Sequence, residues 1–307
     1  MPPPSGFGRL EPHVEQVVDG IYAFVQPDGG WGLNNPGFVV GSRSTLVIDA
    51  ATDRRRTQAL IDAVTDRSPG PIDVLVNTHM HPDHTAGNCV FGDEVTIVAT
   101  AETESAMDQF CLPLLARGHS PIFPTVRLDD LVYRAPELTF SGRLTMYVDD
   151  LAVELLQMGE AHSADDLVAW IPERRVLFAG DLVFHRGVPL FSSAAGLRTA
   201  LHNLAALDPD VIVPGHGGVC GPEAVEEALS WLDYVEALAQ EGIRTGASPL
   251  EVARTADFGP FEGWIEHERI VSNLHQLYAR HNGTTFDQST ATAEMIKFNG
   301  QPLRCTI

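Results

Sequence analysis

The sequence predicts an α/β protein in which two β-sheets lie face to face with helices on their outer sides, a four-layer αββα sandwich. Three observations lead to this prediction. Strand-like and helix-like segments follow one another in two rounds of sheet and then helix. The 307 residues contain 44% hydrophobic residues, enough for a sizeable core. No sharp change of composition divides the chain, so we expect one domain over residues 1–283 and a C-terminal extension over residues 284–307.

The first round begins with a β-hairpin. Two β-branched runs, at 14–18 and 21–25, flank the dipeptide Asp19-Gly20, which favours a tight turn. Further strands are predicted at 38–40, 45–48, 73–77 and 95–99, and helices at 52–65 and 101–115. Residues 1–12 are expected to form a loose arm, and the proline-containing residues 119–134 a long loop or lid.

The second round begins near residue 138. Strands are predicted at 144–148, 152–157, 166–171, 176–179 and 211–213. Helices are predicted at 197–207, 222–240, 249–256 and 262–281. The tail after Asn282 has no strong period, and three roles stay open for it: a dimer arm, a lid or a disordered segment.

The charge and composition exclude several classes of partner. With 20 basic and 41 acidic residues the net charge is −21, whereas nucleic-acid binding requires a basic face. We therefore expect neither a nucleic-acid partner nor an anionic membrane surface. The N-terminus lacks the basic and apolar regions of a signal peptide, and no apolar run approaches the ~18 residues of a membrane span. The four cysteines form no CxxC pair, so we expect a cytoplasmic protein with reduced thiols.

The most informative segment follows the strand predicted at 73–77. His79, His81, Asp83 and His84 fall within six residues there. Four ionisable groups so close together in one loop indicate a bound cation that neutralises and orders them. Imidazole and carboxylate are ligands that zinc accepts. Three later strand ends carry the same residue types, namely His162, Asp181 and His216.

These residues, in this order and at these strand ends, resemble the metallo-β-lactamase superfamily, in the branch with glyoxalase II-like dinuclear sites. The resemblance covers residues 14–282 and implies the αββα sandwich of that family. It implies that one Zn²⁺ is bound by His79, His81 and His162, and a second by Asp83, His84 and His216. It implies that Asp181 bridges the two ions, and that Asp83 takes part in proton transfer as a second catalytic carboxylate.

The chemistry of the set agrees with two metals. Seven ligands exceed what one tetrahedral zinc accepts, but they suit two ions that share a bridging carboxylate and a water molecule. Asp49, which ends the strand at 45–48, is expected to support the ligands from behind. Iron and manganese are the competing metals. Diiron relatives tend to carry a glutamate where this chain has His81, which favours zinc.

The resemblance also narrows the substrate. True zinc β-lactamases lack an aspartate at the position of Asp181, and the chain shows neither the basic surface of nucleic-acid-processing relatives nor the basic patch with which glyoxalase II binds glutathione. A neutral or apolar acyl substrate remains, such as a thioester, a lactone or an ester. Two loops beside the metals are expected to form its pocket. The candidate pocket residues are Trp31, Leu33, Asn35, His185 and Arg186.

Two segments, Trp31–Asn35 and Ile270–Tyr278, are similar to the cyclase/thioesterases of aromatic polyketide biosynthesis in the same superfamily. The resemblance implies thioester hydrolysis, coupled to polyketide cyclisation, on a substrate carried by an acyl carrier protein. Two alternatives stay open: a zinc-dependent lactonase or phosphodiesterase with the same site, and a non-hydrolytic diiron redox or metal-binding protein. A homodimer also stays open.

Overall fold

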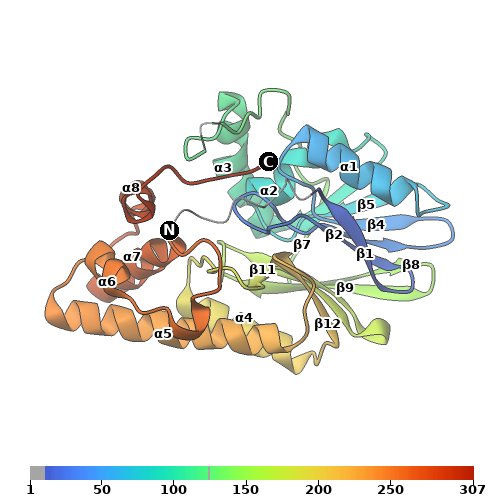
Figure 1. Ribbon diagram of the computed structural model, residues 1–307. Coiled ribbons are helices and arrows are strands. Elements are labelled where there is room, and N and C mark those ends of the chain that lie inside the picture. The colour runs from blue at the N-terminus through green and yellow to red at the C-terminus, as the bar shows by residue number, and fades with distance from the viewer. Residues whose placement is uncertain (1–10, 124) are drawn as a thin grey trace.

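The computed structural model describes residues 11–123 and 125–307 (Figure 1). Nearly all of the arm expected at residues 1–12 therefore lies outside the described residues. The described chain forms a seven-stranded sheet, in the order β1-β2-β3-β4-β5-β6-β7, and a five-stranded sheet, in the order β12-β11-β10-β9-β8. The predicted sandwich of two sheets with outer helices is confirmed.

The first sheet and its helices come from the first half of the chain. Its strands are β1 (His13–Val18), β2 (Ile21–Val25), β3 (Gly37–Val40), β4 (Thr45–Ile48), β5 (Ile72–Val76), β6 (Thr96–Thr100) and β7 (Leu138–Phe140). Its helices are α1 (Arg54–Thr65), the single turn α2 (Pro82–Thr85) and α3 (Ala101–Arg117). The predicted hairpin is confirmed, because β1 and β2 pair antiparallel with Val18 opposite Ile21.

The second sheet and the remaining helices follow. Its strands are β8 (Arg143–Val148), β9 (Leu151–Gly159), β10 (Asp166–Ile171), β11 (Val176–Phe184) and β12 (Val211–His216). The helices are α4 (Ala194–Ala206), α5 (Glu223–Thr245), α6 (Pro249–Thr255), α7 (Arg269–Asn282) and α8 (Gln288–Asn299). In Figure 1, α4 and α5 cover the outer face of this sheet, and α6, α7 and α8 gather at one end of the sandwich.

Three apolar layers hold the sandwich together. Residues of both sheets, such as Val39 and Phe178, meet in the layer between the sheets. On the outer face of the first sheet, Phe38 packs with Leu60 of α1. On the outer face of the second sheet, Leu177 packs with α4, α5 and α7 in the largest cluster. Successive strand residues such as Phe38 and Val39 point to opposite faces, which is why each sheet has two buried sides.

Two helix predictions differ from the structure. The predicted helix 262–281 is wrong over its first turns, because α7 begins only at Arg269. A separate 3₁₀ turn at residues 259–261 precedes it. The tail has no apolar period, and yet it forms α8, which begins with Asp287 accepting hydrogen bonds from the N–H groups of Ser289 and Thr290. A helix is predicted from sequence by the period of its apolar residues. Helix α8 has no such period because it buries just Ala291 and Met295.

Parallel strands bring the predicted site together. β4, β5 and β6 pair in parallel in the first sheet, as do β11 and β12 in the second. The carboxyl ends of parallel strands meet at one edge of a sheet, where loops carry functional side chains. Asp49, His79 and His216 therefore emerge at the same end of the sandwich.

Candidate metal centre

All seven predicted ligands come together at this end of the sandwich. They form two groups in which the possible ligand atoms lie within 4.8 Å of one another. The first group is His79, His81, His162 and Asp181, and the second is Asp83, His84 and His216. These are the sets of side chains that the family resemblance assigned to separate ions, with Asp181 beside the first set; that they bind metal stays a prediction.

In the first group three imidazole nitrogens converge. His81 Nδ1 lies 3.0 Å from His79 Nε2 and 2.8 Å from His162 Nε2. Asp181 Oδ2 lies 3.2 Å from His162 Nε2 and 3.8 Å from His79 Nε2. The residues come from the loop after β5, the loop after β9 and the middle of β11.

The second group is joined to the first through Asp181. Asp83 Oδ2 lies 3.2 Å from His216 Nε2 and 3.9 Å from His84 Nε2. Asp181 Oδ1 lies 3.1 Å from His84 Nε2, and Asp181 Oδ2 lies 3.4 Å from His216 Nε2. Both oxygens of one carboxylate therefore face donor atoms of both groups, which is the arrangement that a bridging ligand needs.

Each of four imidazoles is oriented by a hydrogen bond at Nδ1. The partner is Asp49 Oδ2 for His84, at 2.8 Å, as expected for the supporting role of Asp49. The carbonyl oxygens of Leu190 and Gly29 serve His162 and His216 at 2.9 and 3.1 Å, and Thr78 Oγ1 serves His79 at 3.1 Å. Because these partners accept a proton from Nδ1, Nε2 is the nitrogen that faces the site, and it can bind a metal when the ring is neutral.

The site contains buried polar atoms that the protein does not satisfy. His84 Nε2 and Asp181 Oδ1 are buried and lie 3.1 Å apart, but neither has a hydrogen-bond partner of acceptable geometry. His79 Nε2 and His162 Nε2 both lie within hydrogen-bond distance of His81 Nδ1, whose single N–H serves only one of them, so the other nitrogen keeps a lone pair that a cation could take up. This set of imidazoles and carboxylates, in which four imidazoles are oriented by hydrogen bonds at Nδ1, fits a first-row divalent ion such as zinc.

The electrostatics differ between the two groups. Burial, together with neighbouring imidazoles, lowers the pKa of His81 to about 3, so this ring is neutral and able to bind a metal. Burial acts in the same direction on His216, but Asp181 and Asp83 outweigh it and raise its pKa to about 9. The carboxylates of Asp181 and Asp83 thus favour a positive charge at the second group.

Close backbone approach lets Asp181 sit inside a strand pair. A Cβ atom at Gly215 of β12 would lie 2.0 Å from Asp181 Oδ1, so only glycine leaves room for the carboxylate. The loop before β3 is packed as tightly, because a Cβ atom at Gly29 would lie 2.4 Å from the nitrogen of Gly217. Gly215 and Gly29 therefore let the strand with Asp181 and the loop before β3 approach the segment that carries His216.

The predicted pocket residues occupy different places. Trp31 is half-buried, with its ring 5.4 Å from that of Phe123. His185 is half-buried, its Nδ1 lies 2.8 Å from the carbonyl oxygen of Gly218, and Arg186 is exposed.

Two of the pocket residues have structural contacts instead. Leu33 is only 1% exposed and lies among core residues. Asn35 Nδ2 donates to the carbonyl oxygens of Pro214 and Gly217, at 3.0 and 2.6 Å. The structure therefore departs from the pocket prediction at both positions: the side chain of Leu33 is packed in protein, and Asn35 ties its loop to the segment that carries His216.

Several residues near the site escaped the sequence prediction. Trp31 Nε1 donates to Glu268 Oε1 at 2.8 Å, and the Arg269 guanidinium lies 4.2 Å from the centroid of the Trp31 ring. Phe184 stacks on His216, with 4.9 Å between ring centroids and 4° between planes. Glu268 and Arg269 are more than 200 residues away from Trp31 in the sequence, so no local spacing could reveal them.

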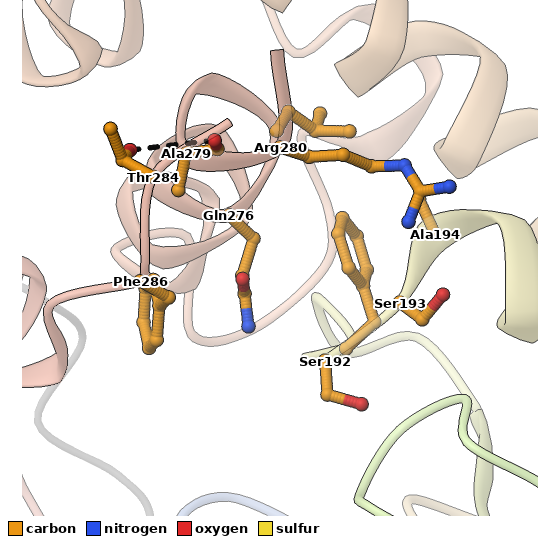
Figure 2. A pocket seen from close by; sticks show the side chains of 10 residues that line it. Ser192, Ser193, Ala194, Gln276, Ala279, Arg280, Thr284 and Phe286 are labelled. Atoms are coloured by element: carbon orange, nitrogen blue, oxygen red, sulfur yellow. Dashed lines mark hydrogen bonds between the residues drawn. The ribbon is translucent and has the colours of Figure 1, made fainter. Parts of the chain in front are cut away.

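A hollow of about 230 Å³ lies beside the site rather than in it (Figure 2). It is lined by Phe191, Ser192, Ser193, Ala194, Gln276, Leu277, Ala279, Arg280, Thr284 and Phe286. None of the seven predicted ligands is among them. The hollow touches the site through Ser192, whose backbone N–H donates to the carbonyl oxygen of His162 at 3.1 Å.

Comparison with known proteins agrees with this geometry. The family model described as the metallo-beta-lactamase superfamily matches residues 29–216, which contain all seven ligands. A type 2 metallo-beta-lactamase of Bacteroides fragilis is 22% identical over 239 residues, which are 74% of this chain and 88% of that protein. A beta-lactamase-like protein 2 homolog of Caenorhabditis elegans is 24% identical, over 74% of this chain and 70% of that protein.

A solved structure has the same fold. The metallo-beta-lactamase from Pontibacter korlensis superposes with a TM-score of 0.60 at 19% identity, and the match covers 73% of this chain and 99% of that one. Among the described residues, no helix combines the length and the apolar character needed to cross a bilayer. The family match, the sandwich and the convergent histidines and aspartates lead to one conclusion: the chain belongs to the metallo-beta-lactamase superfamily.

Proposed function

We propose that this superfamily hydrolase is a dinuclear zinc enzyme that hydrolyses an acyl thioester. The observation that carries the proposal is the position of Asp181, whose two oxygens face donor atoms of both ligand groups. A site with one shared carboxylate and three further ligands for each ion suits two metals rather than one. Zinc is favoured because the site is rich in imidazole.

The residues have separate tasks in this proposal. His79, His81 and His162 would hold one ion, Asp83, His84 and His216 the other, and Asp181 both. Two zinc ions bound there would lower the pKa of a shared water molecule and polarise the acyl carbonyl. Asp83 is the most exposed of the carboxylates in the site, with 17% of its side chain accessible, so it is the group placed to exchange a proton with solvent.

Aromatic side chains around the ligands favour an apolar acyl group. Phe110 lies with its ring centroid 6.3 Å from that of His81, and Phe184 lies 5.7 Å from that of His162. Trp31 and Phe123 contact each other at the rim, and both pack against the largest apolar cluster. Rings of this kind suit the hydrophobic part of a polyketide or fatty acyl chain better than a polyanion. Delivery on an acyl carrier protein and a coupled ring cyclisation complete the proposal.

The test combines elemental analysis with a substrate panel. We expect two zinc ions per chain and the highest kcat/KM for acyl thioesters among thioesters, lactones, esters, phosphodiesters and β-lactams. A zinc-loaded protein without thioester turnover that cleaves lactones or phosphodiesters efficiently would replace the substrate assignment. Iron with a visible ferric absorption band, and no hydrolysis, would replace the hydrolytic function with a redox function.

A further inference from the structure

Three consecutive carbonyl groups after β11 have partners that connect α7 to a predicted metal ligand. The Val188 oxygen accepts a hydrogen bond from Arg269 Nη1 at 3.2 Å, and the Pro189 oxygen accepts one from Asn273 Nδ2 at 2.9 Å. The next oxygen, that of Leu190, lies 2.9 Å from His162 Nδ1. The segment 188–190 thus lies between two side chains of α7 and one imidazole of the site.

The two side chains of α7 that donate these hydrogen bonds are buried polar groups. Arg269 is 2% exposed and Asn273 is 0% exposed. Burial of an arginine and an asparagine is costly unless hydrogen bonds and nearby charges compensate it. The backbone adds a further clamp, because Val188 N–H donates to the Ile265 oxygen at 3.0 Å and Ile265 N–H donates to the Arg186 oxygen at 3.1 Å. Residues 265–273 therefore fix where the segment 188–190 runs.

Arg269 also reaches the other ligand group. Its guanidinium lies 4.2 Å from the Trp31 ring centroid and 5.3 Å from that of Phe184. Phe184 in turn stacks on His216. A cation between two aromatic faces is attracted to both, and more strongly when it is shielded from water. Arg269 thus contacts both the segment 188–190, which lies beside His162, and Phe184, which stacks on His216.

We propose that Arg269 and Asn273 are positioning residues that hold His162 in its metal-binding orientation. By fixing the segment 188–190, they keep the Leu190 oxygen where it accepts the Nδ1–H of His162, which leaves the Nε2 lone pair facing His81 and Asp181. Both residues lie outside residues 29–216, so this part of the site comes from the chain beyond the family match. The inference rests on the proposed two-metal site.

The test measures metal affinity instead of turnover. Asn273→Leu keeps the number and branching of the side-chain heavy atoms and removes the N–H donor. Gln276→Leu, one turn further along α7, is the matched control because no hydrogen bond joins Gln276 to the segment 188–190. Zn²⁺ affinity is measured by competition with a chromogenic chelator, and site geometry by the visible absorption of the Co²⁺-loaded proteins. His162→Ala and His216→Ala provide the reference spectra for the loss of either site.

We expect Asn273→Leu to weaken binding about 10–100-fold at one of the two sites, the usual effect of removing a group that orients a ligand, and its spectrum to change toward that of His162→Ala. Gln276→Leu should match the wild type. Equal loss at both sites, or unchanged affinities in a folded Asn273→Leu protein, would overturn the inference. A wild type that binds no metal would instead overturn the proposed function, and the inference with it.

Arg269→Lys keeps the inference testable if Asn273→Leu does not fold. Lysine retains the charge between the two rings but loses the planar group that donates to Val188. Weaker Zn²⁺ binding at the same site, with unchanged circular dichroism, supports the inference. Wild-type affinity in this variant counts against it.

Discussion

Residues 29–216 and residues 217–307 contribute to the same site in different ways. The first part supplies all seven predicted ligands, from loops and from the strands β11 and β12. The second part supplies none of them, and its helix α7 instead holds the segment next to His162 and the aromatic rings next to His216. The comparison shows that the predicted ligands come from the first part of the chain alone, whereas the residues packed around them come from both parts.

The two contributions also differ in how far they reach along the sequence. His79, His81, Asp83 and His84 lie within six residues, so their proximity follows from the sequence itself. The contacts of Arg269 with Val188 and of Trp31 with Glu268 span 81 and 237 positions. Contacts of that length exist only once the whole sandwich has folded.

The largest effect is expected where both ligand groups depend on one residue. Asp181→Ala removes the shared carboxylate, so we expect the loss of at least one metal ion and a fall in kcat/KM of at least roughly 10²–10³-fold, as for the loss of a group that stabilises developing charge. Elemental analysis and steady-state kinetics measure both. The exposed Asp210→Ala is the control, and wild-type turnover of Asp181→Ala would refute the bridge.

Two matched core substitutions separate stability from positioning. Leu60 of α1 and Leu274 of α7 are both fully buried, and each change to alanine should reduce the free energy of unfolding by about 2–5 kcal/mol. Only Leu274→Ala should also weaken Zn²⁺ binding, because α7 carries the positioning side chains. Denaturant titration and chelator competition test this. Equal loss of affinity in the two variants would show that stability alone accounts for the effect.

Metal removal should affect the ligand-bearing part directly. A ligand that binds only the folded state stabilises it by about 2.7 kcal/mol at 100 times its Kd. For a chain of this size the midpoint Tm should then rise by about 4 °C for each Zn²⁺ ion bound at that concentration, when Zn²⁺ is added to chelator-treated protein. Differential scanning calorimetry measures the shift. Mg²⁺ at the same concentration is the control, since it prefers oxygen ligands and should leave Tm nearly unchanged.

The smallest expected effect concerns a carboxyl group of the second part. Burial raises the pKa of Glu266 from 4.5 to about 8, and the neighbouring Glu268 adds to the shift although Arg269 opposes it. A pKa above the unfolded value means that the protonated form favours folding. This contribution is complete at low pH, declines as the pH rises from about 4.5 to about 8, and is lost above that range.

Glu266→Gln should therefore flatten the fall of Tm between pH 5 and pH 9. Glutamine keeps the shape of the neutral carboxyl group and cannot ionise, so the variant should gain stability relative to the wild type as the pH increases. The exposed Glu262→Gln should follow the wild type throughout. A constant difference between Glu266→Gln and the wild type across this range would contradict the assignment.

The sequence allowed the fold and the ligands to be predicted because both depend on local patterns. Apolar runs of strand length located the strands, and polar residues at the strand ends located all seven ligands. Helix α8 escaped because it buries too few apolar residues to produce a period. The start of α7 was placed too early because residues 262–268, which precede the helix, were included in it. The roles of Leu33, Asn35, Arg269 and Asn273 depend on distant packing, which no spacing in the sequence records.

The hydrogen bonds that hold the Trp31 loop have a consequence for the entry of a bulky substrate into the proposed active site. Gly29 accepts the hydrogen bond of His216, and Asn35 donates to the carbonyls on either side of that histidine, so this wall cannot swing outward without freeing a ligand to rotate. The segment 119–134 is held differently: Phe123 contacts the Trp31 ring, and among the described residues the segment has no hydrogen bond to any of the seven predicted ligands. In the proposed enzyme, a change that displaces the Trp31 loop would therefore also release His216, whereas a change within 119–134 would leave the hydrogen bonds of the predicted ligands in place.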